Sequence, residues 1–370
     1  MKIVELTNVD FSLRHFLLPL MRGIRARGHE VVGVCADGPL LTQVRAEGFR
    51  VIGLPLARRV SPLAHARAFL ALIRLFRAER PDLVHAHMPI SGFLARLAAR
   101  CAGVPHIAYT CHGFWFNNPG PCPRRAAGFA MEWLAGRLTD VYLTVSQEEA
   151  EQARRLHICA RATPVGNGRD PASFRPDPAA RARIRAALAV PHDRVVVIAV
   201  SRLVRHKGYP ELAAAMRDVP EAELWVVGER LASDRGQDML AVLRGAGLGA
   251  RLRLLGYRED VAALLAAADI FALPSHFEGL PMSVIEAMLT GLPVVATNIS
   301  GPREQVVDGE TGLLIPPRQA APLAAALARL AADPGLRAAM GEAGRARACD
   351  LYDEAKVVNH TLDLLGLPAA

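Results

Sequence analysis

Short apolar runs alternate with amphipathic stretches along most of the chain. Residues 1–6 predict a first strand, and stretches such as Leu63–Arg77 and Leu212–Arg217 predict helices. Continuous apolar runs are typical of strands buried on both faces, and their alternation with helices predicts a parallel sheet between helical layers. The other runs that predict strands are Val31–Ala36, Leu83–Ala86, Val141–Val145, Val195–Val200, Leu224–Val227, Ile270–Leu273 and Val294–Thr297.

A turn-rich segment, residues 166–171, interrupts this alternation, which restarts at Val195. The chain has 370 residues, more than the roughly 250–300 at which single cores stop growing. We therefore predict an α/β protein with two doubly wound, Rossmann-like domains, 1–168 and 169–350, and a C-terminal helix in 351–370 that packs back towards the first domain. Ligands of such sheets bind beyond the carboxyl ends of the strands, so the site is expected in a cleft between the two domains.

Composition indicates a packed globular protein, with 51% hydrophobic and 22% charged residues. No run approaches the roughly 20 apolar residues of a membrane span, and residues 1–6 lack the pattern of a signal peptide. Six scattered cysteines form no C-x-x-C pair, which favours a reducing compartment. We expect a cytoplasmic location.

Positive charge is concentrated in the first part of the chain. Residues 1–170 hold 22 basic and 13 acidic side chains, out of 44 and 36 in the whole chain. This asymmetry predicts an anionic partner, which could be nucleic acid, an anionic membrane or a phosphate-bearing substrate. Aromatic residues make up only 5%, and no nucleic-acid-binding motif is present, so nucleic acid is not expected.

Two predicted helices in the basic part, Leu63–Arg80 and Pro121–Arg137, carry arginines beside apolar side chains. Such a helix can lie on an anionic membrane, or it can be an ordinary core-facing helix with a solvated outer face. With the charge asymmetry, this pattern favours peripheral attachment of the N-terminal domain to an anionic membrane.

The strongest chemical signal is the segment from Phe277 to Glu286, which follows a predicted strand and opens a helix ending near Leu289. Pro281 suits the first helical turn, and the backbone N–H groups at this end, those of Leu280, Met282 and Ser283, would form a phosphate site. The Glu278 and Glu286 carboxylates could each accept hydroxyl groups of a sugar or ribose. The alternative is two solvent-facing glutamates.

A second signal follows the strand Val195–Val200. Arg202 and Lys207 lie on one strand-to-helix loop, and Lys207 is one of only three lysines in the chain. Arginine can grip a diphosphate with two hydrogen bonds, and lysine adds a compact charge. A solvated basic turn is the alternative.

Taken together, these residues resemble glycosyltransferase family 4. The pattern consists of E-x7-E at Glu278 and Glu286 with Arg202 and Lys207 upstream. Further matches are Asn167-Gly168, His112-Gly113 and residues 291–297. The stretches around His85–His87 and Tyr109–Phe116 resemble bacterial capsule and exopolysaccharide transferases, which often use undecaprenyl-diphosphate-linked acceptors at the inner face of the membrane. The resemblance therefore implies a cytoplasmic protein attached peripherally at the inner face of the cytoplasmic membrane.

The resemblance implies a GT-B fold and transfer with retention of configuration from a nucleotide diphosphate sugar, expected to be UDP-linked. It implies that Arg202 and Lys207 hold the diphosphate and that Glu286 binds the ribose. Glu278 and the backbone of Gly279, Leu280, Pro281 and Met282 would hold the transferred sugar and phosphate. His112 would lie near the donor sugar from the opposite domain, and the backbone around Tyr257 would face the base. The implied acceptor is a polyprenyl-diphosphate-linked saccharide.

We expect no metal and no cofactor. The chain has no D-x-D motif, and two cations with a helix N-terminus can stabilise a leaving diphosphate. His85 and His87, two apart at a strand end, could form a metal pair, line the acceptor cleft at His87, or simply pack.

The loop after the first strand, Thr7–His15, lacks the glycines that many family members carry there. Without them the backbone cannot approach a phosphate closely. We therefore place Phe11 and Ser12 on the acceptor side, with Ser12 as a helix cap, together with His87 and Asn167.

Two other functions remain open. The chain could be another GT-B enzyme, such as a nucleotide-sugar 2-epimerase, or a catalytically silent partner of a transferase. Product analysis and turnover assays would separate them.

Overall fold

The computed structural model describes residues 1–368 except 57–60, 119, 192, 231–233 and 235, and it divides into two compact units. The first unit comprises Met1–Gly166 together with Ala355–Ala370, and the second comprises Asn167–Glu354. The sequence-based boundaries, 168/169 and 350/351, lie within a few residues of these divisions.

The first unit is built on a parallel sheet with the strand order β3-β2-β1-β4-β5-β6-β7 within the described residues. Its strands are β1 (Lys2–Leu6), β2 (Glu30–Cys35), β3 (Arg50–Gly53), β4 (Leu83–His87), β5 (His106–Cys111), β6 (Val141–Thr144) and β7 (Thr163–Pro164). The helices are α1 (Asp10–Ser12), a π-helical turn (Leu13–Leu17), α2 (Leu18–Ala26), α3 (Leu41–Ala46), α4 (Pro62–Glu79), α5 (Pro89–Ala102), a 3-10 turn (Trp115–Asn117), α6 (Cys122–Gly136), α7 (Gln147–Arg155) and α16 (Glu354–Leu364).

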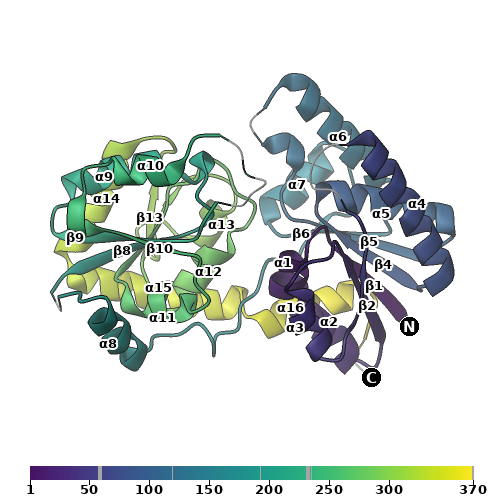
Figure 1. Cartoon of the computed structure of the whole chain (residues 1–370), viewed down its shortest axis with the longest axis horizontal. Helices are drawn as coiled ribbons and strands as arrows, with labels where there is room; N and C mark the ends of the chain where they lie inside the picture. Colours follow the sequence, from purple (N-terminus) through teal and green to yellow (C-terminus); the bar gives the residue numbers. More distant parts are fainter. Residues whose placement is uncertain (57–60, 119, 192, 231–233, 235, 369–370) are drawn as a thin grey trace. The chain divides into compact units, whose positions relative to one another are not determined.

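The second unit repeats this plan, with the order β10-β9-β8-β11-β12-β13 and helices on both faces of the sheet (Figure 1). Its strands are β8 (Val195–Val200), β9 (Ala222–Val227), β10 (Leu252–Gly256), β11 (Ile270–Leu273), β12 (Val294–Thr297) and β13 (Gly312–Ile315). The helices are α8 (Pro178–Ala187), α9 (Tyr209–Ala215), α10 (Met239–Arg244), α11 (Val261–Ala267), α12 (Met282–Leu289), α13 (Pro302–Gln305), α14 (Ala320–Ala332) and α15 (Pro334–Leu351), with 3-10 turns at Arg205–Lys207, Met216–Asp218 and Gly249–Arg251.

Both sheets have the Rossmann strand order, which reverses between the strands β1 and β4 in the first unit and between β8 and β11 in the second. Ligands of doubly wound sheets bind at the carboxyl end of such a reversal. The predicted fold of two Rossmann-like domains is confirmed. The loops after β1, β4, β8 and β11 are therefore the first places to look for a site.

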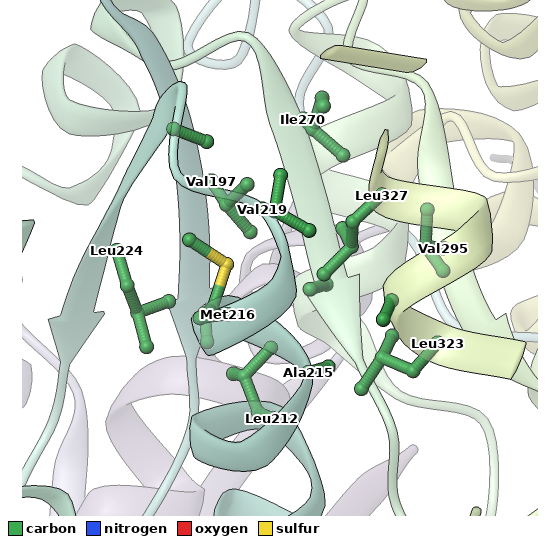
Figure 2. Close-up of a cluster of buried hydrophobic side chains, with 14 of the residues drawn as sticks. Val197, Leu212, Ala215, Met216, Val219, Leu224, Ile270, Val295, Leu323 and Leu327 are labelled. Atoms are coloured by element: carbon green, nitrogen blue, oxygen red, sulfur yellow. The ribbon is translucent and has the colours of Figure 1, made fainter. Parts of the chain in front are cut away.

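The core of the second unit lies between its sheet and helices α9 and α14 (Figure 2). Strand residues such as Val197 and Val295 meet Leu212 on α9 and Leu327 on α14, and all four are fully buried. Burying one such side chain stabilises the fold by roughly 1.5–3 kcal/mol. These contacts hold strands β8 and β12 in place, and with them the ends that carry the functional loops.

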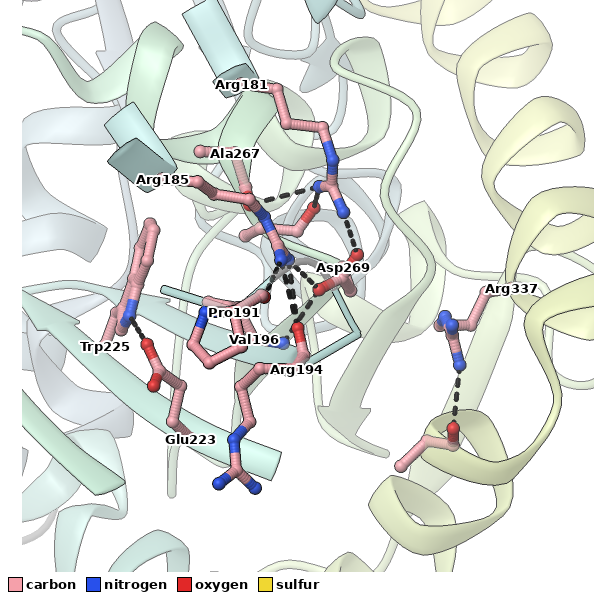
Figure 3. Close-up of polar contacts among 12 residues, drawn as sticks. Arg181, Arg185, Pro191, Arg194, Val196, Glu223, Trp225, Ala267, Asp269 and Arg337 are labelled. Atoms are coloured by element: carbon pink, nitrogen blue, oxygen red, sulfur yellow. Dashed lines mark hydrogen bonds and ion pairs between the residues drawn. The ribbon is translucent and has the colours of Figure 1, made fainter. Parts of the chain in front are cut away.

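Strand β11 is also anchored by a polar contact at its start (Figure 3). The carboxylate of Asp269 accepts hydrogen bonds from Arg181 (2.7 Å) and Arg185 (2.6 Å) on helix α8 and from the backbone N–H of Val196 (2.8 Å). Three donors on one partly buried carboxylate tie α8, β8 and β11 together. The opposite ends of β8 and β11 are those that bear the candidate site.

Helix α16 packs against α2 of the first unit. A Cβ placed on Gly23 of α2 would meet Val358 and Leu362 of α16, and Arg27 forms an ion pair of 2.6 Å with Asp363. Of the described helices, none combines the length and the apolar character needed to cross a membrane.

Candidate active site

The loop after β8 and the loop after β11 meet at an ion pair. Nζ of Lys207, in the 3-10 turn before α9, lies 2.5 Å from Oε1 of Glu278, and both side chains are largely buried. The close approach depends on Gly208, whose φ of +77° few other residues adopt and whose added Cβ would lie 1.9 Å from the carbonyl oxygen of Pro274. The structure thus brings together two of the predicted site residues, from opposite sides of the strand reversal.

The carboxylate of Glu278 is fixed from a second direction. Oγ of Ser275 donates to the same Oε1 atom at 2.6 Å, and the carbonyl of Ser275 accepts from the Thr297 hydroxyl at 2.6 Å. Ser275 and Thr297 are fully buried. Because its partners are rigid core groups, the Glu278 carboxylate is preorganised.

The backbone of Gly279–Pro281 is held by two side-chain amides. Nδ2 of Asn167 donates to the carbonyl of Leu280 at 2.8 Å, and Nε2 of the buried Gln305 donates to that of Pro281 at 3.0 Å. A Cβ on Gly301, which has a φ of +86°, would lie 1.8 Å from the carbonyl of Gly279. These two hydrogen bonds and the close approach of Gly301 fix the backbone that leads into α12.

Helix α12 begins at Met282, and Pro281 is its extended N-cap rather than part of its first turn. The expected position of Pro281 is therefore wrong by one residue, because its ψ of 122° is not helical. No side chain caps this end, and the Val284 N–H bonds to the Pro281 carbonyl. The N–H groups of Met282 and Ser283 remain as the donors that a phosphate can use.

Glu286 lies further along α12 and is largely buried. Its Oε1 accepts a hydrogen bond of 2.7 Å from Nε of Arg169. A buried carboxylate is stable when it is paired in this way. Arg169 therefore orients Glu286, and nothing in the residue pattern had singled out this arginine.

Arg202 and Tyr257 are the other two predicted donor-side residues. Nη1 of Arg202 forms an ion pair of 2.6 Å with Asp234, and the Arg202 side chain is 43% exposed. An exposed pair contributes at most about 1 kcal/mol, so a diphosphate can displace Asp234. Tyr257 follows β10 and is half exposed.

His206 adds an uncharged surface beside Lys207. Its ring stacks on Phe277, with the ring centroids 4.5 Å apart. Burial, together with the positive charges of Lys207 and Arg202, lowers the pKa of His206 to about 4. The ring is therefore neutral at physiological pH.

In the first unit, four of the polar side chains at the strand reversal form a hydrogen-bonded chain. Oε1 of Glu5 lies 3.0 Å from Nδ1 of His85, and Oε2 lies 2.9 Å from Nε2 of His87. Nδ1 of His87 in turn lies 3.0 Å from Nε2 of His112. Glu5 on the neighbouring strand β1 thus supplies a carboxylate to both His85 and His87.

Burial alone would raise the pKa of Glu5, but His85 and His87 outweigh it and lower the pKa to about 2. Burial and the nearby His85 lower the pKa of His87 to about 4, against the opposing effect of Glu5. Burial, with His87 and His85 nearby, also holds the pKa of His112 well below its ordinary value. At neutral pH, Glu5 is a carboxylate and His87 and His112 are neutral.

The other predicted acceptor-side residues lie after β1 and in the second unit. Phe11 is 43% exposed and its ring contacts His15. Ser12 is buried and makes no capping hydrogen bond, because the helical segment already starts at Asp10. Asn167, expected on the acceptor side, belongs to the second unit and bonds Leu280 beside the predicted donor residues.

Two family models match the chain. The model of glycosyl transferases group 1 matches residues 180–347, and that of the glycosyl transferase 4-like domain matches residues 13–168. A GDP-mannose-dependent alpha-(1-6)-phosphatidylinositol monomannoside mannosyltransferase of Mycolicibacterium smegmatis is 38% identical, over 68% of each chain. The chain belongs to the group 1 glycosyltransferases.

Two further likenesses extend over more of this glycosyltransferase. The UDP-Gal:alpha-D-GlcNAc-diphosphoundecaprenol alpha-1,3-galactosyltransferase of Escherichia coli is 28% identical, over 84% of this chain and 85% of that protein. The crystal structure of Anabaena HepE in complex with UDP superposes with a TM-score of 0.84 at 22% identity, covering 99% of this chain and 100% of that one. The predicted GT-B fold and the prediction of a hexosyltransferase are confirmed.

The residues that the sequence did not reveal are those that hold the predicted site residues in position. In this glycosyltransferase, Arg169 pairs with Glu286, Ser275 and Gln305 hold the segment before α12, and Glu5 joins two histidines. One signal existed for Glu5, which is an acidic residue among the apolar residues Ile3, Val4 and Leu6.

Proposed function

We propose that this glycosyltransferase moves a hexosyl group from a UDP-sugar to a lipid-linked saccharide, with retention of configuration and without a metal ion, in bacterial surface polysaccharide synthesis. The observation that carries the proposal is the cluster of Lys207, Glu278 and the N-terminus of α12 at the strand reversal of the second unit.

The electrostatics of this cluster fit a diphosphate leaving group. Before the donor binds, the charge of Lys207 is balanced by Glu278. A diphosphate would attract Lys207, the exposed Arg202 and the N–H groups of Met282 and Ser283, all of which act as fixed donors to developing negative charge. Glu278, still held by Ser275 but released from Lys207, would then accept hydrogen bonds from hydroxyl groups of the sugar, and Glu286 from those of the ribose. No cofactor enters this scheme, in which the UDP-sugar is a substrate.

The relatives favour the chemistry of both substrates. The E. coli relative is named for a UDP-linked donor and a diphosphoundecaprenol acceptor, and HepE was crystallised with UDP. We therefore propose a UDP-sugar as donor and a polyprenyl-diphosphate-linked saccharide as acceptor.

A lipid-linked acceptor requires contact with a membrane, and helices α4 and α6 offer surfaces for it. On α6, Trp133 and Leu134 are 40% and 46% exposed beside the exposed Arg137. On α4, exposed leucines and arginines alternate along one helical stripe, Leu63, Arg67, Leu70, Arg74 and Arg77. Apolar side chains among arginines suit the interface of an anionic membrane. We propose peripheral attachment of the first unit through these helices.

The donor is found by measuring nucleotide diphosphate release. The purified protein is incubated with UDP-, GDP- and ADP-sugars in EDTA, with and without bacterial lipid extract. The test variant is Glu286→Ala, and Glu310→Ala, an exposed glutamate of the same unit, is the matched control. We expect lipid-dependent release of UDP from one donor, lost in Glu286→Ala and kept in Glu310→Ala.

Each other outcome rejects a defined part of the proposal. Release only without EDTA would reject metal independence, and conversion of the nucleotide sugar to its epimer would indicate an epimerase. Nucleotide binding without any turnover would indicate a silent partner. The anomeric proton coupling of the product, measured by NMR, tests retention.

A further inference from the structure

The hydrogen-bonded series of side chains Glu5, His87 and His112 has a defined direction of proton donation. A carboxylate only accepts hydrogen bonds, so Nε2 of His87, 2.9 Å from Oε2 of Glu5, carries the shared proton. Because His87 is neutral, its Nδ1 atom has a lone pair. The contact of 3.0 Å between this Nδ1 and Nε2 of His112 is therefore donated by His112. The same reasoning leaves a lone pair on Nδ1 of the neutral His112.

This hydrogen-bonded series is rigid as well as directional. Glu5 and His85 are fully buried and His87 is 2% exposed. Glu5 faces His85 across the β1–β4 register, and the other ring nitrogen of His85 lies 2.8 Å from the Thr110 hydroxyl on β5. Reversing one ring would leave a buried donor facing a donor, or an acceptor facing an acceptor, which is costly in a low-dielectric interior. His112 lies at the end of this chain, next to the carboxyl end of β5, and is only partly buried.

We propose that Glu5 and His87 are positioning residues that hold His112 as the Nε2–H tautomer, so that its Nδ1 atom is a hydrogen-bond acceptor at the carboxyl end of β5. A neutral acceptor at this place selects a substrate group that can donate, such as a hydroxyl group, over groups that only accept. This selection rests on the proposed function, whereas the tautomer does not.

The same side chains could in principle hold a cation. Ligand atoms of Glu5, His85 and His87 lie within 4.8 Å of one another. A metal would use the lone pair of Nε2 of His87 and displace its proton, which would reverse the direction of the chain. Elemental analysis of the purified protein separates the two readings, and a stoichiometric divalent metal would overturn the proposal.

The tautomers are read directly by long-range 1H–15N NMR of the full chain labelled with 15N-histidine, with signals assigned from His87→Asn and His112→Asn. We expect both His87 and His112 as Nε2–H tautomers. In Glu5→Gln the amide N–H can donate to His87, so the His112 signal should shift towards the Nδ1–H form. Thr110→Val is the matched control, because it removes a buried partner of His85 outside the path to His112, and should leave the His112 signal unchanged. A Nδ1–H His112 in the wild type would refute the inference.

Discussion

The substitution Gly208→Ala tests whether the ion pair between Lys207 and Glu278 carries the activity. An alanine Cβ would lie 1.9 Å from the Pro274 carbonyl oxygen, whereas real Cβ contacts stay beyond 3.0 Å, so the two segments must separate by about 1 Å. Gly208 directly follows Lys207, and Pro274 directly precedes Ser275, which bonds Glu278. The required movement therefore separates the two halves of the cluster. A misplacement of about 1 Å can reduce the rate about 100-fold, and we expect a loss of kcat of that size.

Gly247→Ala is the matched control for backbone strain. Gly247 has a φ of +75°, almost the same as the +77° of Gly208, but no atom lies within 4 Å of its added Cβ. Both variants should lose roughly 1–2 kcal/mol of unfolding free energy from the left-handed backbone, and Gly208→Ala should lose more because of the clash. Urea denaturation and UDP release are measured on both. Full activity in Gly208→Ala, or an equal loss of activity in Gly247→Ala, would refute the reasoning.

Three further outcomes are expected. Glu286→Gln should weaken UDP binding about tenfold, and Arg169→Met should weaken it by less, since Arg169 acts only through Glu286. Calorimetry measures the affinities, with Glu310→Ala as the control, and an unchanged affinity in Glu286→Gln would contradict the ribose contact. The free energy of unfolding should fall by up to about 3 kcal/mol as the pH drops from 6.5 to 4, because burial and His85 lower the pKa of folded His87 to about 4 and the unfolded chain therefore binds a proton at higher pH than the folded one. Urea denaturation across this pH range measures the loss, which should be smaller in His87→Asn. The double variant Trp133→Ser/Leu134→Ser should reduce co-sedimentation with phosphatidylglycerol vesicles without lowering the free energy of unfolding, and about 1 M NaCl should release the wild-type protein from these vesicles. Equally strong binding of the wild type to pure phosphatidylcholine vesicles would contradict an electrostatic attachment.

Many of the strands buried on both faces were predictable from the sequence, although the central strand β5, whose run His106–Cys111 mixes polar and apolar residues, was not. The predicted bounds of β8, β11 and β12 agree with the structure because these central parallel strands are uninterrupted apolar runs. Strand β10 lies at the edge of its sheet and escaped prediction. Its Arg253 breaks the apolar run, and only the structure shows that this guanidinium bonds the buried Glu223 of β9 at 3.0 Å.

Some residues of the candidate site were likewise predictable from the sequence, whereas their contacts were not. Lys207 and Glu278 were predictable because their chemistry is local to a strand-to-helix loop and a helix start, and both loops follow readable strands. The ion pair between them forms because β8 and β11 are neighbours in the sheet, and the sequence does not give the order of the strands. The sequence identified Asn167 but not its contact, and it did not identify Gln305, because both side chains donate to backbone carbonyls 113 and 24 residues away. Every residue has a backbone carbonyl, so residue types do not reveal such a partner.

Glu5 shows most clearly why the remainder needed a structure. An acidic residue inside an apolar strand predicts a buried carboxylate that must have partners, and two histidines at a strand end predict rings on one face. Neither pattern says that the two strands are neighbours, because β1 and β4 are separated by two other strands in the chain. Once the register places Glu5 opposite His85, the direction of donation follows from the acceptor-only chemistry of a carboxylate. The protonation of His112, 107 residues from Glu5 along the chain, is thus a consequence of strand order, and a substitution on the first strand should be detectable at the end of the fifth.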